Sequence, residues 1–270
     1  MFNREVELEI AAAAERLGVE AAALLAVAEV ESAGKAYATV QGRKEPLIRF
    51  EGHYFDRRLA GEKRNRARAE GLADPAAGAV RNPAGQAARW ALLARAEAID
   101  RQAARESASW GLGQVMGAHW AWLGYASVDE LVAEARSSVG GQAALMARYI
   151  DKAGLLPALR SHDWAAFARG YNGPAYRQNT YDTKLAAAYA RHAAGAEAGA
   201  LPSSPEISGL LRRGSRGEAV LDRFDRLIDA HGRDDAGAAE IGQHVLEVDG
   251  DQRLVLDDED LQVGKLGGLR

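Results

Sequence analysis

Helical hydrophobic repeats separated by glycines dominate the chain, and this pattern constrains the fold more than any other feature. Apolar residues recur at helical spacing over 4–17 and over 20–33, and these segments are followed by Gly18 and Gly34. Further helices are predicted over 86–106, 127–136, 139–153, 163–169 and 183–194. In the first 195 residues, only the stretch around residue 48 has a strand-like pattern. The sequence therefore predicts a mainly α-helical fold.

Three segments between the long helices carry local signals. EPLIRFEGHYF (45–55) is β-rich and aromatic, and predicts a short strand leading into a helix. Residues 61–84 hold many charges, glycines and prolines, and predict a long surface loop. Ser127, followed three residues later by Glu130, forms a capping box and predicts the start of a helix.

The composition changes after residue 195. The segment GAEAGALPSSPEISG is small, polar and proline-bearing, which is typical of a linker. Beyond it, a helical pattern is followed by HVLEVDG and QRLVLD, which alternate like a hairpin. Residues 201–270 hold 9 basic and 15 acidic side chains, an excess of negative charge that the first part lacks. We predict a first domain over 1–195, a linker over 196–209 and a small α+β C-terminal domain over 210–270.

Composition excludes several classes of function. The chain has no cysteine, so disulfides and thiolate chemistry are excluded, and its six histidines are not paired at metal-ligand spacing. A net charge of −4 argues against a nucleic-acid partner. No window approaches ~18 apolar residues, so no membrane insertion is expected. The N-terminus lacks the basic and apolar regions of a signal peptide, so synthesis in the cytoplasm without such a peptide is expected.

Glu31 is the first candidate for chemistry. It lies four residues after Val27 and three after Ala28, so it continues the apolar stripe of its helix. A carboxyl group in apolar surroundings resists ionisation, so its pKa should rise, as a general acid for glycoside cleavage requires. Glu29 lies on another side of the helix, where we expect solvent. Taken alone, Glu31 is also compatible with a structural salt bridge to an arginine.

The segment SWGLGQVMG is the second candidate and runs from Ser109 through Met116. Its glycines allow backbone to approach a ligand closely, and Gln114 can hydrogen-bond an acetamido or hydroxyl group. Sugar rings stack on indole, so Trp110 is a possible platform. For the nearby Trp120 and Trp122, core packing is the favoured interpretation.

The third candidate is ARGYNGP, in which a helix stops abruptly and leaves the Tyr171 hydroxyl and the Asn172 amide at a turn. By itself this segment indicates only a helix end. The order and spacing of VESAG, SWGLGQVMG and ARGYNGP together are more specific.

These three segments resemble the pattern of the lysozyme-like superfamily, which includes goose-type lysozymes and lytic transglycosylases. The longer strings AVAEVESAGKAY, GRKEPLIRFEGHYFDRRL, SASWGLGQVMG and DWAAFARGYNGPAYRQNTYDTKLAAAY look like the phage N-acetylmuramidase domain family. The resemblance covers roughly residues 8–192. It implies a lysozyme-like α-helical catalytic domain that needs no cofactor or metal and cleaves peptidoglycan.

The resemblance also assigns roles to residues. It implies that Glu31 is the general acid and that Gln114, Tyr171 and Asn172 line the groove or act on the transition state, with Ser109, Trp110 and Met116 in the same substrate-binding segment. Glu51 is a candidate for a second catalytic role, or it holds Arg49 or His53 in place. Asp56 and Asp182 are the other carboxylates near these segments.

The expected activity is hydrolysis of the β-1,4 bond between N-acetylmuramic acid and N-acetylglucosamine in peptidoglycan. A lytic transglycosylase that yields anhydro-muramyl ends and a non-catalytic glycan-binding virion protein are the alternatives. Without a signal peptide, a monomeric enzyme made in the cytoplasm would reach the cell wall through a holin or an injection apparatus. The C-terminal part faintly resembles peptidoglycan-binding modules, and a small packing or partner-contact domain is equally compatible with it.

Overall fold

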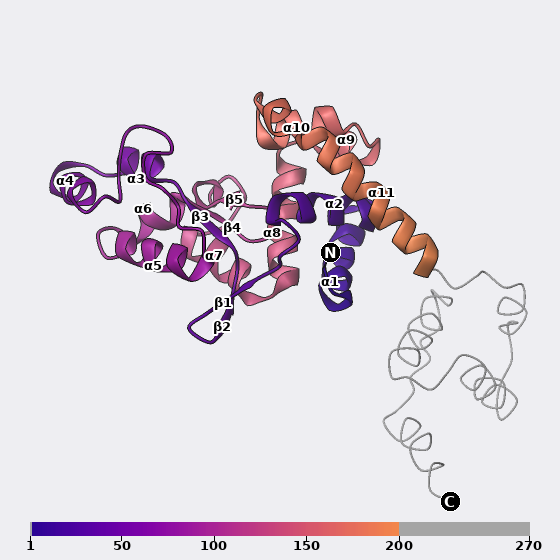
Figure 1. The fold of residues 1–270 in the computed structure, drawn as a ribbon, viewed down its shortest axis with the longest axis horizontal. Coiled ribbons are helices and arrows are strands. Elements are labelled where there is room, and N and C mark those ends of the chain that lie inside the picture. The colour runs from indigo at the N-terminus through magenta and orange to yellow at the C-terminus, as the bar shows by residue number, and fades with distance from the viewer. Residues whose placement is uncertain (1, 200–270) are drawn as a thin grey trace, which may run out of the picture. The chain divides into compact units, whose positions relative to one another are not determined.

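A computed structural model of the chain describes residues 2–199, with the side chains of 196–199 excepted. Figure 1 shows the order of its elements. The helices are α1 Arg4–Leu17, α2 Ala21–Ser32, α3 Gly52–Arg58, α4 Gly61–Ala69, α5 Gln86–Glu97, α6 Arg101–Glu106, α7 Val128–Ser137, α8 Val139–Lys152, α9 Leu156–Arg160, α10 Trp164–Asn172 and α11 Tyr181–Gly199, with the 3-10 turns η1 Gly117–His119 and η2 Tyr176–Asn179. The strands are β1 Ala38–Val40, β2 Arg43–Glu45, β3 Ile48–Phe50, β4 Ala108–Trp110 and β5 Val115–Met116. The prediction of a mainly α-helical fold is confirmed for the described part of the chain.

Local signals explain where the first helices begin and end. The Asn3 side chain accepts a hydrogen bond from the Val6 backbone N–H at 3.0 Å and so caps α1. Gly18, with a φ of 67°, ends α1 in the left-handed conformation. The predicted capping box of α7 is present, because the Ser127 hydroxyl accepts from the Glu130 N–H at 3.2 Å.

Two small antiparallel sheets carry the strands. The hairpin β1–β2 turns at Gln41 and Gly42, whose φ values of 49° and 77° are those of a primed turn. The second sheet has the order β3–β4–β5, with Ile48 opposite Trp110 and Ser109 opposite Met116. This sheet holds the glycine-rich segment beside the chain that leads to Glu51.

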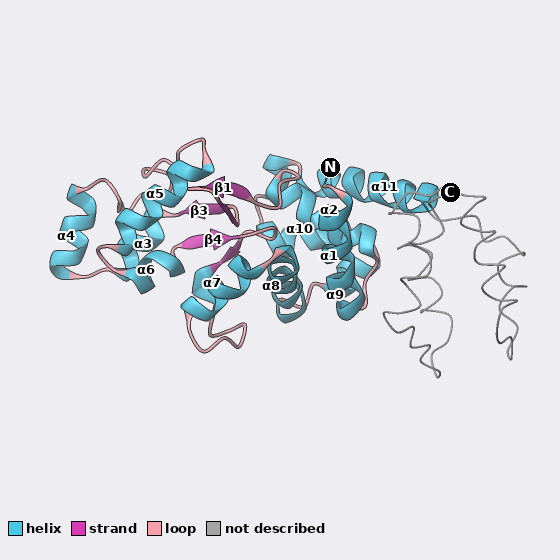
Figure 2. Cartoon of the chain, turned by 90° about the horizontal axis from the view of Figure 1, so that it is seen from below, coloured by secondary structure: helices cyan, strands magenta, loops and turns pink. Residues whose placement is uncertain are grey.

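The described residues pack into two hydrophobic cores. The helical core joins α1, α2, α8, α10 and α11, and the sheet-side core joins the second sheet to α3–α7. Helix α8 belongs to both, because Met146 faces the helical core and Leu145 faces the sheet-side core. Figure 2 shows the strands lying between α3, α5 and α6 on one side and α1, α2 and α10 on the other.

Two sequence predictions need correction. The predicted loop over 61–84 contains α4, which is anchored by the fully buried Ala67 in the sheet-side core. The predicted helix over 86–106 is divided into α5 and α6, because the Asp100 side chain accepts from the Ala103 N–H at 3.0 Å and starts a new helix.

The predictions for the C-terminal part concern residues that lie at or beyond the end of the described chain. Helix α11 continues to Gly199, past the expected domain boundary at residue 195. The rest of the predicted linker and the C-terminal domain over 210–270 lie outside the described residues. Within residues 2–199, no helix combines the length and apolar character that crossing a membrane requires.

Candidate active site

Glu31 lies in the last turn of α2, a helix that is buried on almost every side. Leu24, Val27 and Ala28 are fully buried in the helical core, and the Glu31 carboxyl continues their face. The helix ends directly after it, where Ala33 adopts a left-handed conformation with a φ of 52°. Burial raises the pKa of Glu31 to about 7, against the smaller opposing effect of a hydrogen bond from Asn172. The predicted rise in pKa is thus present in the structure.

Asn172 lies at the end of α10 and points at Glu31. Its Nδ2 donates a hydrogen bond to Glu31 Oε1 at 2.6 Å. Its Oδ1 is buried and has no hydrogen-bond partner among the described residues. The next residue, Gly173, has a φ of 85°, so the helix stops and the amide stays at its tip. The Tyr-Asn turn and the helix-end glutamate are therefore neighbours, as the resemblance implied.

Tyr171 connects this turn to the glycine-rich segment. Its hydroxyl donates to the Gly113 carbonyl oxygen at 2.6 Å, and burial together with the nearby Glu31 charge raises its pKa well above the usual value. A Cβ atom at Gly113 would lie 2.6 Å from the Met146 side chain and 2.8 Å from the Tyr171 hydroxyl. A glycine at 113 is therefore what permits this close contact.

Two further tyrosines lie within electrostatic range of Glu31, and sequence reasoning missed both. Burial and the negative charge of Glu31 raise the pKa values of Tyr149 on α8 and Tyr181 on α11. The positive charge of Arg49 acts on Tyr181 in the opposite direction. Tyr181 thus lies within electrostatic range of both Glu31 and the β3 strand that carries Arg49. No local sequence signal distinguishes these tyrosines from core residues.

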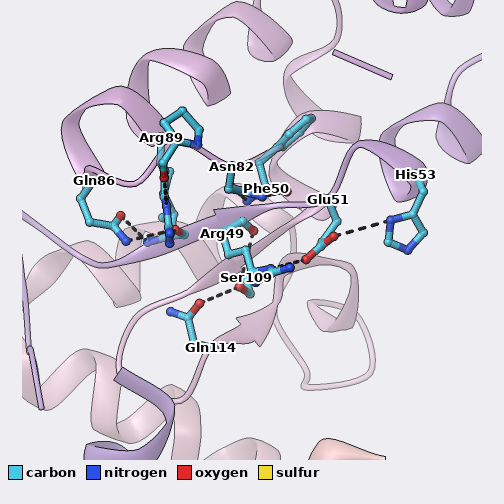
Figure 3. Close-up of polar contacts among 11 residues, drawn as sticks. Arg49, Phe50, Glu51, His53, Asn82, Gln86, Arg89, Ser109 and Gln114 are labelled. Atoms are coloured by element: carbon cyan, nitrogen blue, oxygen red, sulfur yellow. Dashed lines mark hydrogen bonds and ion pairs between the residues drawn. The ribbon is translucent and has the colours of Figure 1, made fainter. Parts of the chain in front are cut away.

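Ser109 lies in β4, and the side chain of Gln114, from the turn that connects β4 to β5, is directed at it, as Figure 3 shows. The Ser109 hydroxyl donates to Gln114 Oε1 at 2.9 Å, and Gln114 Nε2 donates to the Gly111 carbonyl at 2.8 Å. The backbone of Gln114 is left-handed, with a φ of 47°, and its side chain holds this turn in place. Met116 is half-buried opposite Ser109. Direct contact of these residues with a sugar stays a prediction.

The exposure of the tryptophans contradicts two interpretations made from the sequence. Trp110 is 1% exposed, and its Nε1 donates to the Arg105 carbonyl at 3.1 Å. A sugar ring cannot stack on an indole that is enclosed in this way, so the predicted platform at Trp110 is wrong. Trp120 packs against the sheet-side core as favoured, but Trp122 is 45% exposed, and its favoured assignment to the core is wrong.

Glu51 follows β3 and makes two local contacts, which Figure 3 shows. Its Oε1 lies 2.6 Å from Arg49 Nε, and its Oε2 lies 3.6 Å from His53 Nδ1. The hydrogen bond to Arg49 is the contact expected if Glu51 holds Arg49 or His53 in place, whereas His53 Nδ1 is near Glu51 without a hydrogen bond to it. Asp56 is buried in a two-pronged pair with Arg68, at 2.6 and 2.9 Å. Its hydrogen bonds to Arg68 hold its pKa below the usual value.

Two amide side chains, one near the end of the predicted loop and one just after it, complete the free edge of β3. Asn82 pairs with Phe50, because its Oδ1 accepts from the Phe50 N–H at 3.0 Å and its Nδ2 donates to the Phe50 carbonyl at 2.6 Å. Gln86 makes the same two types of contact with Ile48, at 3.0 and 3.3 Å. Side-chain amides thus take the place of a neighbouring strand and fix the position of the chain leading to Glu51 (Figure 3).

The site contains a glutamate at a helix end that has a pKa near neutrality, is hydrogen-bonded by an asparagine and has tyrosines nearby. Glycosidases use a glutamate of this type for acid catalysis. Comparison with known proteins agrees with this class. The N-acetylmuramidase family model matches residues 20–193. The chain therefore belongs to the N-acetylmuramidase family, which comprises glycoside hydrolases acting on peptidoglycan.

A solved structure supports the same assignment. The crystal structure of Burkholderia AP3 phage endolysin is 38% identical in sequence, with a TM-score of 0.60. The match covers 69% of this chain and 71% of that chain. A comparison with curated proteins gave no match.

Proposed function

We propose that Glu31 protonates the glycosidic oxygen when the bond between N-acetylmuramic acid and N-acetylglucosamine is cleaved. The observation that carries this proposal is its half-buried carboxyl group, whose pKa is raised to about 7. An ordinary exposed glutamate is ionised at neutral pH and has no proton to give. With a pKa near the working pH, Glu31 can both donate this proton and recover it.

The neighbours of Glu31 have supporting roles in this proposal. Asn172 donates to Glu31 Oε1 and so fixes the direction of the carboxyl group. Tyr171 holds the Gly113 carbonyl and keeps the glycine-rich turn against the acid. The glycan then binds over Glu31, Ser109 of β4 and the turn that contains Gln114, and water completes the cleavage to leave a reducing muramyl end.

We assign Glu51 to a positioning role instead of a second catalytic one. One of its carboxylate oxygens accepts a hydrogen bond from Arg49 Nε, and the other lies 3.6 Å from His53 Nδ1. The charge of Arg49 in turn acts on Tyr181, which also lies within electrostatic range of Glu31. Glu51 therefore influences the site through Arg49, whose side chain is largely exposed and available to substrate.

Two substitutions test these assignments on purified sacculi. Glu31→Gln keeps the shape and the hydrogen bond to Asn172 but removes the proton, and should lower the rate of lysis by about 10²–10⁴-fold. Glu51→Gln changes only a positioning contact and should lower the rate of lysis only about tenfold, which corresponds to a rise of about 1.4 kcal/mol in the activation free energy. Retained lysis by a folded Glu31→Gln enzyme would refute the assignment of Glu31 as the general acid. Equal losses in both variants would make Glu51 the second catalytic carboxylate.

The products distinguish the remaining alternatives. Mass spectrometry of digested peptidoglycan should find reducing muramic acid ends. Anhydro-muramyl ends would instead mean that the muramyl 6-hydroxyl attacks in place of water. Binding of sacculi without release of soluble fragments would mean a non-catalytic binding protein.

We further propose that the protein acts as an endolysin, like the solved phage protein that it resembles. Expressed alone in the cytoplasm, it should leave cells intact, and co-expression with a holin should cause lysis. Lysis without a holin would contradict dependence on such a partner while leaving the glycosidase assignment in place.

A further inference from the structure

Trp122 is an exposed indole on a well-anchored turn. Leu8 and Trp122 are the large hydrophobic side chains that stand exposed among the described residues, each at 45%. The turn is held by hydrogen bonds from the Leu123 N–H to the His119 carbonyl at 2.8 Å and from the Tyr125 N–H to the Trp120 carbonyl at 2.9 Å. Leu123 is buried and anchors the turn to the sheet-side core, while the neighbouring Trp122 side chain is exposed to solvent.

Trp122 belongs to a continuous set of aromatic rings that leads to Glu31. The rings of His119, Trp122 and Tyr149 contact one another, with centroids 5.5–5.7 Å apart. Tyr149 then contacts Tyr171, at 5.2 Å between centroids. We name Trp122, His119, Tyr149 and Tyr171 the aromatic track. Its inner end is beside the acid, because Tyr171 directly precedes Asn172, whose Nδ2 donates to Glu31 Oε1 at 2.6 Å.

The outer end of the track presents flat, neutral rings. Burial, with a smaller effect of the Arg58 charge, lowers the pKa of His119 below its usual value, so its ring is uncharged at neutral pH. The apolar C–H face of a sugar ring stacks on such a surface, whereas a single indole is far smaller than the area that a stable protein interface buries.

We propose that Trp122, supported by His119, is a binding subsite for a sugar ring of the glycan strand beyond the two sugars at the cleaved bond. This inference rests on the proposed function of Glu31. Two ring-to-ring steps of 5.7 and 5.2 Å separate Trp122 from Tyr171, which lies beside Glu31, so a glycan strand with its cleaved bond at Glu31 can reach Trp122 with a sugar beyond that bond. Trp122 then contributes to binding and not to the chemical step.

Steady-state kinetics with soluble, peptide-free glycan strands test this subsite. Trp122→Ala should raise KM about tenfold while kcat changes little, because the lost contact is equal in the ground and transition states. Trp122→Phe should recover part of the loss, since a smaller aromatic face remains. Leu8→Ala is the matched control, because it removes an equally exposed apolar side chain from α1 and should leave KM unchanged.

A binding measurement supplies a second readout. In the inactive Glu31→Gln background, adding the same glycan strands should change the tryptophan fluorescence, and Trp122→Phe should remove most of that change. Unaltered KM in Trp122→Ala together with an unaltered fluorescence response in Trp122→Phe would overturn the subsite. If Trp122→Ala changes only the sedimentation of the protein, the indole belongs to a contact between copies, and the subsite is likewise overturned.

The two proposals fail separately. Full activity of Glu31→Gln would refute the general acid and leave the Trp122 binding data to be judged by themselves. An inactive Glu31→Gln enzyme, together with an unaltered KM in Trp122→Ala and an unaltered fluorescence response in Trp122→Phe, would refute the subsite alone.

Discussion

Replacing Glu31 by glutamine should stabilise the folded protein while inactivating it, by an amount that depends on pH. Burial raises the pKa of Glu31 from its ordinary value of 4.5 to about 7 in the folded state. The folded protein therefore holds a proton that the unfolded chain has lost between about pH 4.5 and 7, so the stability of the wild type falls as pH rises through this window. Glutamine does not ionise, so the free energy of unfolding of the variant does not fall in this way.

The expected size follows from the shift in pKa. At 1.36 kcal/mol per unit, a rise to about 7 corresponds to about 3 kcal/mol of unfolding free energy above pH 7. The glutamine side chain can still accept the hydrogen bond from Asn172, so little else is lost. Urea unfolding at pH 4 and pH 8 measures this difference. Glu31→Gln should match the wild type at pH 4 and exceed it by about 3 kcal/mol at pH 8.

Glu29→Gln is the matched control on the same helix. Burial by itself would raise the pKa of Glu29, but hydrogen bonds from Arg191 and His192 and their charges outweigh it, and the pKa lies below its usual value. Its ionised form therefore stabilises the fold above that value, and the substitution should lower stability at pH 8. The same difference for Glu31→Gln at both pH values would refute a raised pKa for this group.

Three further predictions concern the rate and the packing. Because Glu31 must be protonated to act, kcat/KM should fall as pH rises past about 7. Asn172→Ala removes a hydrogen bond that lowers the pKa of Glu31. In a pH–rate profile, the fall in kcat/KM should therefore occur at higher pH in this variant than in the wild type. Gly113→Ala forces a Cβ atom to 2.8 Å from the hydroxyl of Tyr171, and should reduce lysis and cost roughly 1–3 kcal/mol in urea unfolding. Gly52→Ala would meet a side-chain atom at 2.3 Å and should cost a similar roughly 1–3 kcal/mol in the same assay. A free energy of unfolding in urea equal to that of the wild type would contradict the argument for the glycine concerned.

The sequence by itself determined the helices that present the acid and the turn. Helical spacing of apolar residues located α1, α2 and α8 closely, and the capping box located the start of α7. The same spacing placed Glu31 on a buried face and gave the direction of its pKa shift. These features depend on hydrogen bonds and side-chain positions within a few residues of one another, so a single stretch of sequence specifies them.

Tertiary packing decided which side chains surround the acid and which tryptophan meets solvent. Tyr149 and Tyr181 come from helices far along the chain, and they come within electrostatic range of Glu31 only when α8 and α11 pack against α2 or its neighbours. Trp110 and Trp122 lie in one short segment, yet the first is enclosed and the second is exposed. Exposure is set by the distant elements that cover a side chain, because burial is a property of the assembled cores and not of the local pattern.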